Sequence, residues 1–437
     1  MIVVLRQSIT FAVLFLQHLL FCSLSMTNLL SNPMKWFFVS LSVIYVCEAT
    51  NESNYPPPCP QKIWCYSDLL KYNALYQLDD EFEIPFLRKR LVNSSDVVLA
   101  EYDELVKSNG GEPPSKDQLR EFINTYLEDC AELTDFLPDE YKKQIWRTLL
   151  RKVAPDVTEN EDRYTLISIP YGFVIAGGQF NELYYWDTYW IIRGLYLSDL
   201  PETAKGIIEN FLYLVRKLGF IPNGTRVYYL NRSQPPLLPS MIQTYQTYTG
   251  DMEFIFENLE TITEEFEWWR QNRQVKFVKD GETYAMFHYD VRAGDPRPES
   301  YLADYDLGIQ IKSENERNAF YANIKSATES GWDFSSRWFD KYFANANGSL
   351  LDTKPSILIQ VDLNSFLQKN ARLISKWWFA ANDAEKGEIY KRSPTIFSNP
   401  FKRCCTAKMK AYGLTGTWKM KYTVKDSTYQ ILPRCLP

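Results

Sequence analysis

The stretch from Gly331 to Trp338, which reads GWDFSSRW, combines residue types that could transfer a proton to a sugar. It places one carboxylate, Asp333, between two tryptophans, with an arginine and two serine hydroxyls close by. A neutral carboxylic acid can protonate the leaving oxygen of a glycosidic bond, while a second carboxylate activates water on the opposite face of the sugar ring. We therefore take Asp333 as the candidate general acid of a glycoside hydrolase.

Four other segments concentrate charged side chains, aromatic side chains and glycine in predicted loops, and they cover residues 177–187, 222–226, 231–236 and 297–301. Taken together with the Gly331 stretch, they predict a polar pocket with aromatic walls that suits a hydroxyl-rich ligand. The alternative is that the charged loop residues are simply solvated and that most aromatic residues fill the core.

The composition excludes several other classes of site. The chain has 437 residues and a net charge of −6, and it lacks a basic stripe with interleaved aromatics, which argues against a nucleic-acid partner. Its two histidines are His18 and His288, so a His-rich zinc site is excluded and a Ser-His-Asp site would depend on His288 alone. Proton transfer is therefore expected from carboxylates, lysine or tyrosine.

Two apolar runs near the N-terminus indicate export. Residues 34–49 resemble a signal peptide, with a short basic start, an apolar core and small residues at the exit, so that Met34 is an alternative start to Met1. The earlier run, residues 2–24, could instead form a membrane anchor, which would make membrane association a property of the N-terminus. Glycosylation sequons agree with a secreted or extracellular protein, and they begin at Asn51, Asn93, Asn223, Asn231 and Asn347.

The cysteines fit the same compartment. Cys59 and Cys65 could close a small loop under oxidising conditions, although spacing alone leaves the pairing open.

Hydrophobic periodicity predicts a chain dominated by helices. We expect helices over residues 117–129, 139–153, 181–197, 201–218, 235–248, 254–274, 314–327 and 361–378. Residues 167–180, rich in glycine, are expected to form an extended loop that approaches the site, and residues 290–300 a polar loop. The alternation of helices and polar loops favours an all-α barrel of helical hairpins, with the loops meeting at one end.

The ordered motifs resemble the trehalase family. The segment YYWDTYW at 184–190 follows a Gly-Gly-x-Phe turn and resembles that family's first signature; NRSQPP at 231–236, RPES at 297–300 and ESGWDFSSRW at 329–338 resemble further family motifs. The resemblance covers residues 116–380.

This resemblance implies an (α/α)6 toroid that hydrolyses α,α-trehalose to glucose with inversion, without a cofactor or a metal ion. It implies that Asp333 is the general acid, with trehalose as the small-molecule partner. It also implies a set of substrate-binding residues: Phe180, Trp186, Asp187, Asn223, Arg232, Gln234, Arg297, Glu299 and Gly331.

Two alternatives stay open for individual residues of this set. Trp186 and Trp332 could be core residues. Arg232 and Arg297 could form structural ion pairs with Asp187 or Glu299.

The chain departs from the family pattern at two places. Gln179 follows the Gly-Gly turn where the family has arginine, and a glutamine lacks the charged bidentate grip of a guanidinium. After Trp378 the resemblance fades, and the sequence lacks both the second family signature and the later glutamate that the resemblance implies as general base. We therefore expect a toroid that is incomplete at its C-terminus. The alternative function is a truncated or pseudoenzyme form that binds sugar without turnover because the general base is absent.

These patterns divide the chain into four expected parts. Residues 1–49 form an N-terminal extension with the signal peptide, and residues 50–115 the first segment of the mature chain. Residues 116–392 form the partial toroid, and residues 393–437 a divergent tail.

Overall fold

The computed structural model describes residues 42–44, 59, 61–78, 84–135, 144–279, 282–339 and 348–401. All of them belong to the unit Leu41–Pro437. Apart from residues 42–44, the expected signal peptide lies outside the described residues, as do the sequons at Asn51 and Asn347 and the tail after residue 401. Within the described residues, no helix combines the length and the apolar character that crossing a membrane requires.

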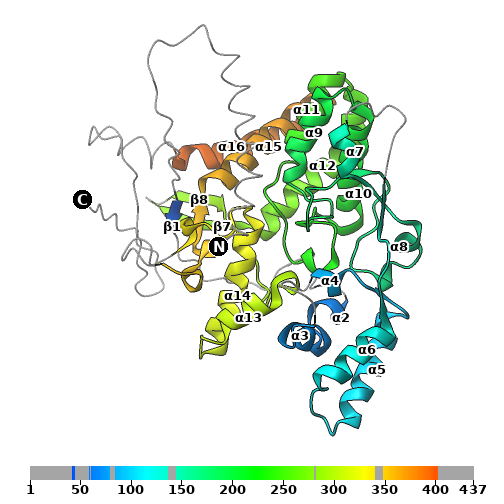
Figure 1. The fold of residues 1–437 in the computed structure, drawn as a ribbon. Coiled ribbons are helices and arrows are strands. Elements are labelled where there is room, and N and C mark those ends of the chain that lie inside the picture. The colour runs from blue at the N-terminus through cyan, green and yellow to red at the C-terminus, as the bar shows by residue number, and fades with distance from the viewer. Residues whose placement is uncertain are drawn as a thin grey trace, which may run out of the picture. The chain divides into compact units, whose positions relative to one another are not determined.

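Five helices form the helical group on which the candidate site is built (Figure 1). Helix α10 contacts α9, α11 and α12, while α15 contacts α11, α12 and α16. Their bounds are α9 Asp187–Leu197, α10 Pro201–Leu218, α11 Leu238–Thr249, α12 Met252–Asn272 and α15 Val361–Ala380, with α16 Ala384–Phe401 packed against α15. The predicted all-α class is confirmed, because neighbouring helices in the chain pack against one another as hairpins.

The remaining α-helices lie before α9 or between α12 and α15 in the chain. Those before α9 are α2 Lys62–Cys65, α3 Asp68–Leu75, α4 Ile84–Leu87, α5 Ser95–Ser108, α6 Lys116–Tyr126, α7 Gln144–Leu149 and α8 Pro155–Glu159. Between α12 and α15 lie α13 Tyr301–Gly308 and α14 Glu314–Glu329, which pack against each other. Helix α3 also contacts α13, so the first segment of the chain reaches the region near the site.

Local sequence signals set several helix ends. Ser115 and Gln118 form a reciprocal capping box at the start of α6, and Asp251 accepts a hydrogen bond from the Phe254 backbone N–H at the start of α12. Pro201 occupies the first turn of α10, and Gly219 ends that helix with a positive φ of 80°, as the sequence predicted. Each cap satisfies backbone groups that a helix end would otherwise leave without a partner.

Short strands are the part of the fold that periodicity did not predict. Strands β7 Gln274–Lys279 and β8 Glu282–Phe287 form an antiparallel hairpin directly after α12. A three-stranded antiparallel sheet follows the order β4-β5-β6. Its strands are Leu133–Asp135, Leu150–Val153 and Phe173–Val174; the remaining pairs join β1 Ser42–Ile44 to β9 Leu358–Gln360, and β2 Arg90–Leu91 to β3 Leu127–Glu128.

Two predicted helices need correction. The helix expected over 139–153 includes only α7 among the described residues, because Leu150–Val153 forms strand β5 between β4 and β6. The helix expected from residue 181 begins at Asp187 instead, because residues 181–186 pair with another loop through a bridge between Tyr184 and Gly224. In both cases backbone pairing with distant segments replaced the helix that the local pattern favoured.

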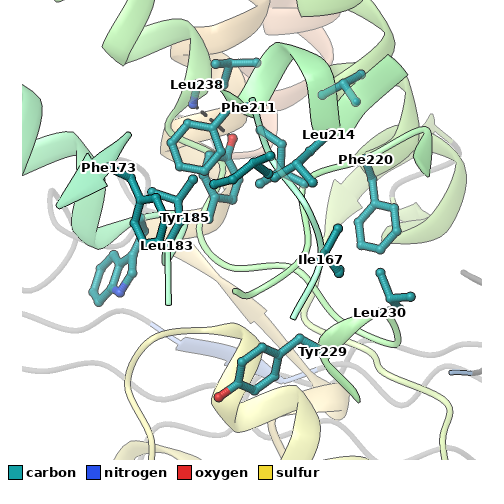
Figure 2. Close-up of a cluster of buried hydrophobic side chains, with 14 of the residues drawn as sticks. Ile167, Phe173, Leu183, Tyr185, Phe211, Leu214, Phe220, Tyr229, Leu230 and Leu238 are labelled. Carbon is teal, nitrogen blue, oxygen red and sulfur yellow. Dashed lines mark hydrogen bonds between the residues drawn. The ribbon is translucent and has the colours of Figure 1, made fainter. Parts of the chain in front are cut away.

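The core next to the site joins the loops to the helices (Figure 2). Leu183 and Tyr185, from the loop before α9, pack with Phe211 and Leu214 of α10. The Tyr185 hydroxyl accepts a hydrogen bond from the Leu238 backbone N–H at the start of α11 and donates one to Glu265 of α12. The loop that leads into Asp187 is therefore fixed by three helices at once.

A disulfide joins Cys59, which precedes α2, to Cys65, the last residue of that helix, and this confirms the pairing that the sequence left open. Cys130, the free cysteine among the described residues, is partly buried.

Candidate functional site

Asp333 lies in the loop that follows α14, and the fold brings this loop against the loop before α9. Gly331 has a φ of +70°, in the left-handed region that favours glycine. A Cβ atom at this position would approach Cζ2 of Trp186 to 2.5 Å. Gly331 and Trp186, which lie 145 residues apart in the sequence (331 minus 186), are therefore in direct contact beside Asp333.

Asp333 is exposed to solvent, yet it is surrounded by enough protein that desolvation raises the pKa of its carboxyl group. A group that touches solvent while protein atoms surround it lies in a concave part of the surface. Arg297 and Arg232 oppose this pKa shift through their positive charges, and Glu299 adds to it. A raised pKa favours the protonated carboxyl that a general acid needs.

Asp187, the first residue of α9, is the second carboxylate of the site. Burial raises its pKa to about 6, and the nearby negative charge of Asp333 contributes in the same direction. Like charges in one desolvated site disfavour simultaneous ionisation, which is a common feature of functional carboxylate pairs. Asp187 and Asp333 thus influence each other electrostatically.

Arg232 and Glu299 form an ion pair at the same site. The Arg232 Nη2 atom donates to Glu299 Oε1 at 2.5 Å, and the guanidinium lies 4.8 Å from the centre of the Tyr229 ring. Arg232 is 1% exposed, yet its Nε and Nη1 atoms have no hydrogen-bond partner, and neither has Glu299 Oε2. Buried donors and acceptors of this kind normally find partners, so these atoms are available to a polar ligand.

Arg297 is held differently from Arg232. Its Nε and Nη2 atoms donate to the two carboxylate oxygens of Asp304 at 2.9 and 2.7 Å, and its guanidinium lies 4.9 Å from the centre of the Phe334 ring. Arg232 therefore pairs with Glu299, one of the partners that the sequence offered, whereas Arg297 pairs with Asp304, which sequence reasoning missed. Asp304 lies in α13, seven residues from Arg297, and this spacing carried no recognisable signal.

Gln234 and Asn223 hold neighbouring loops together. Gln234 Oε1 accepts a hydrogen bond from the Trp186 backbone N–H, and the Asn223 side-chain amide donates to the Ser233 carbonyl. Both side chains are buried, which leaves no room for a glycan on Asn223 in this structure. Gln234 thus joins the loop before α9 to the loop of residues 231–236, and Asn223 joins the loop of residues 222–226 to the same loop.

The two tryptophans that the sequence left undecided occupy different environments. Trp186 is 7% exposed and packs against Trp190, so it belongs to the core as well as to the site wall. Trp332 is 47% exposed, with the Arg337 guanidinium 5.5 Å from its ring centre, so it is not a core residue.

Phe180 lies in the turn of residues 177–180, where Gly177 and Phe180 exchange backbone hydrogen bonds. Its ring contacts Tyr184 edge-on, with the ring centres 5.8 Å apart. The carbonyl of Gln179 accepts a hydrogen bond from Arg88 Nη2 at 2.5 Å. A guanidinium from the first segment of the chain thus stands at the turn where the sequence has glutamine.

Buried ion pairs that the sequence did not indicate support these loops. Glu329, at the end of α14, accepts hydrogen bonds from Arg273 Nε and Nη2 and from the Ser233 backbone N–H. Arg226 donates to both carboxylate oxygens of Glu132 and through Nε to Glu182. In the sequence these residues are charged side chains among apolar neighbours. Such a pattern is too common to predict a buried ion pair.

The arrangement offers groups of the kinds that a neutral polyhydroxyl ligand and a proton transfer to it would require. Asp333 supplies a protonatable carboxyl, Asp187 and Glu299 supply acceptors, and Arg232 supplies free donors. Among the described residues, no three His, Cys, Asp or Glu side chains cluster as a metal site would require.

Comparison with known proteins identifies the family. A family model described as Trehalase matches residues 87–402, beyond both ends of the 116–380 range in which the motifs were recognised. Trehalase from Pimpla hypochondriaca is 38% identical over 360 residues, which cover 78% of this chain and 61% of the relative. Trehalase from Homo sapiens is 37% identical over 363 residues, covering 77% and 60%.

A solved structure, neutral trehalase Nth1 from Saccharomyces cerevisiae, aligns with a TM-score of 0.44 at 20% identity over 57% of this chain and 52% of that one. The chain spans about three fifths of the length of the curated relatives that it matches. With the ordered motifs, the loop geometry around Asp333 and a family match over residues 87–402, the chain belongs to the trehalase family.

Proposed function

We propose that this chain hydrolyses α,α-trehalose to two glucose molecules with inversion, and that Asp333 is the general acid. The observation that carries this proposal is the environment of Asp333, whose carboxyl is open to solvent while its surroundings raise its pKa. Such a group holds its proton to a higher pH than a free aspartate does, which favours delivery of that proton to the glycosidic oxygen. Its relatives named trehalase support the choice of substrate.

The remaining site residues would position the disaccharide. The free Nε and Nη1 donors of Arg232 and the free Oε2 acceptor of Glu299 suit sugar hydroxyls, which both donate and accept hydrogen bonds. Phe180 and Trp186 would supply apolar contact to the ring faces. The inverting mechanism also needs a base that activates water, with the two carboxyl groups about 6.5–9.5 Å apart.

The assay for this function is glucose release from trehalose by the purified chain. Asp333→Asn should lower kcat/KM by about 10²–10⁴-fold, because an amide cannot donate the catalytic proton in the same way. Asp306→Asn, an exposed aspartate of α13, is the matched control and should keep wild-type activity. Equal activity of Asp333→Asn and wild type would rule out the assigned acid.

The stereochemistry of the products tests inversion separately. Inversion at the attacked carbon releases one β-glucose, while the leaving glucose keeps its α configuration. Proton NMR of the first products should therefore show equal amounts of the two anomers before mutarotation. Two α-glucose molecules at early times would contradict inversion.

A second candidate is a form that binds sugar without turnover. The observation that favours it is the state of the carboxylates next to Asp333: Glu299 is tied to Arg232, and the pKa of Asp187 is raised to about 6. One Glu299 oxygen is engaged by a guanidinium, and a carboxyl with a pKa of about 6 is still partly protonated at neutral pH, so neither carboxylate is fully free to act as the base. Calorimetric binding of trehalose without glucose release would support this candidate, whereas the absence of both binding and turnover would exclude both functions.

The proposed location is outside the cell or on the outer face of its membrane. The disulfide between Cys59 and Cys65 supports it, because such bonds persist in oxidising compartments. Mass spectrometry of the protein recovered from the medium of expressing cells should find a mature N-terminus after residue 49. Retention of the unprocessed chain inside the cells would contradict this location.

A further inference from the structure

Lys325 is a buried cation in α14, eight residues before Asp333. It is 1% exposed, and its ammonium group donates to the Ala293 carbonyl at 3.0 Å and to the Asp295 carbonyl. Lysine is rarely buried to this degree, because removing its charge from water is costly unless hydrogen bonds compensate. The two carbonyls supply that compensation, so Lys325 is part of a built contact and not an incidental surface charge.

The loop that Lys325 holds leads to the site. It covers residues 291–297, which lie between strand β8 and the short turn Pro298–Ser300 that carries Glu299. Ser326 accepts a hydrogen bond from the Val291 backbone N–H at the start of this loop, and Asp304 accepts one from the Arg297 backbone N–H at its end. Lys325 supplies the contacts in the middle. The loop is thus held at three places. Its path determines where Arg297, at its end, and Glu299, in the next turn, are placed.

The charges around the ammonium group come from several elements. Asp295 in the loop, Glu299 in the following turn and Asp304 of α13 favour its charged form, while Arg232 opposes it. Burial is the largest influence and lowers the pKa of Lys325 to about 8. The lysine can therefore lose its proton in a pH range where an exposed lysine would stay charged.

We propose that Lys325 is a positioning residue for the hydrolysis at Asp333, because its ammonium group fixes loop 291–297 and thereby sets the places of Arg297 and Glu299. It acts through this loop and need not touch the sugar. The effect on catalysis rests on the proposed function, whereas the contact between Lys325 and loop 291–297 can be tested without turnover.

Deprotonation should weaken this contact. Charged donors form hydrogen bonds about twice as strong as neutral ones, so the hold on the two carbonyls weakens as pH rises through about 8.

The stability of the fold should change in the opposite direction. The folded-state pKa lies below the value of about 10.4 for a free lysine, so between these values the unfolded chain binds more protons and this group's contribution to stability rises with pH. A loss of activity in this range would therefore not reflect unfolding driven by Lys325.

The experiment compares Lys325→Met, Lys325→Arg and the control Lys312→Met, which changes an exposed lysine before α14. We expect Lys325→Met to lower kcat/KM by roughly 10-fold or more, since misplacing site groups by about 1 Å can cost 10²-fold. Lys325→Arg should keep part of the activity and move the alkaline limb of the pH profile upward, because arginine stays charged. Lys312→Met should match wild type in both activity and profile.

Hydrogen–deuterium exchange supplies the readout that does not depend on turnover. At one pH, peptides that cover residues 291–297 should exchange faster in Lys325→Met than in wild type, while peptides of α10 should not change. Wild-type kcat/KM in Lys325→Met together with unchanged exchange would overturn the proposal. If wild type releases no glucose, the proposed function fails and the exchange result alone decides the role of Lys325. If Lys325→Met does not fold, Lys325→Arg decides: the proposal is overturned when the alkaline limb of its pH–activity profile is identical to that of wild type.

Discussion

Replacing Glu329 by glutamine should destabilise the fold and disturb the site together. Glu329 and Arg273 are both 0% exposed, and the carboxylate accepts two hydrogen bonds from the guanidinium and one from the Ser233 backbone N–H. The glutamine side chain has the same shape but carries no charge, and its amide group presents donors to a guanidinium that can only donate. Arg273 would be left as a buried and unpaired charge.

The expected loss is about 3–5 kcal/mol, the usual cost of removing one partner from a buried ion pair. We expect the lower end, about 3 kcal/mol, because the remaining amide oxygen can still accept one of the three hydrogen bonds. Such a loss changes the unfolding equilibrium constant by about a hundredfold, at about 1.4 kcal/mol for each factor of ten.

Urea unfolding followed by tryptophan fluorescence measures this loss as a lower midpoint with an unchanged slope. The control is Glu257→Gln, the same substitution at an exposed position of α12, which should shift stability by no more than about 0.5 kcal/mol. The double variant Arg273→Met/Glu329→Met should recover part of the loss, because it removes both charges. The reasoning is refuted if Glu329→Gln costs no more than Glu257→Gln.

Two further predictions concern the contact between the site loops and the charge on Asp187. Gly331→Ala should lower the free energy of unfolding by about 2–4 kcal/mol, because it combines strain at positive φ with the approach of the new Cβ to Trp186. The control Gly110→Ala has a similar φ but nothing near its Cβ, so it should cost only about 1 kcal/mol in the same urea measurement. Equal losses would show that the Trp186 contact is unimportant. Asp187→Asn should raise the melting temperature at pH 7.5 and leave it nearly unchanged at pH 4, since the pKa of Asp187 is raised to about 6 and its ionised form is therefore disfavoured in the folded state. A melting temperature that rises equally at both pH values would contradict a role for this ionisation.

Much of the fold followed from local sequence. Helices α6, α10, α12, α14 and α15 were predicted within a few residues from their 3.6-residue apolar pattern, and all but α15 also have a side-chain cap or a helix-ending glycine. Strand β5 and the β7–β8 hairpin were not predicted, because they depend on pairing between strands. The apolar pattern of Asn181–Trp186 also favoured a helix, but the bridge between Tyr184 and Gly224 keeps this segment out of α9.

For the site, the sequence by itself determined which side chains are available and in what order they occur. Asp333, Asp187, Arg232 and Glu299 could be named from their motifs, since residue type and spacing are local properties. Only the tertiary structure decided their partners: Arg297 with Asp304, Glu329 with Arg273, and Lys325 with the carbonyls of loop 291–297. The pKa shifts of Asp333 and Asp187 are likewise tertiary, because desolvation depends on the protein packed around a carboxyl and not on its neighbours in the sequence.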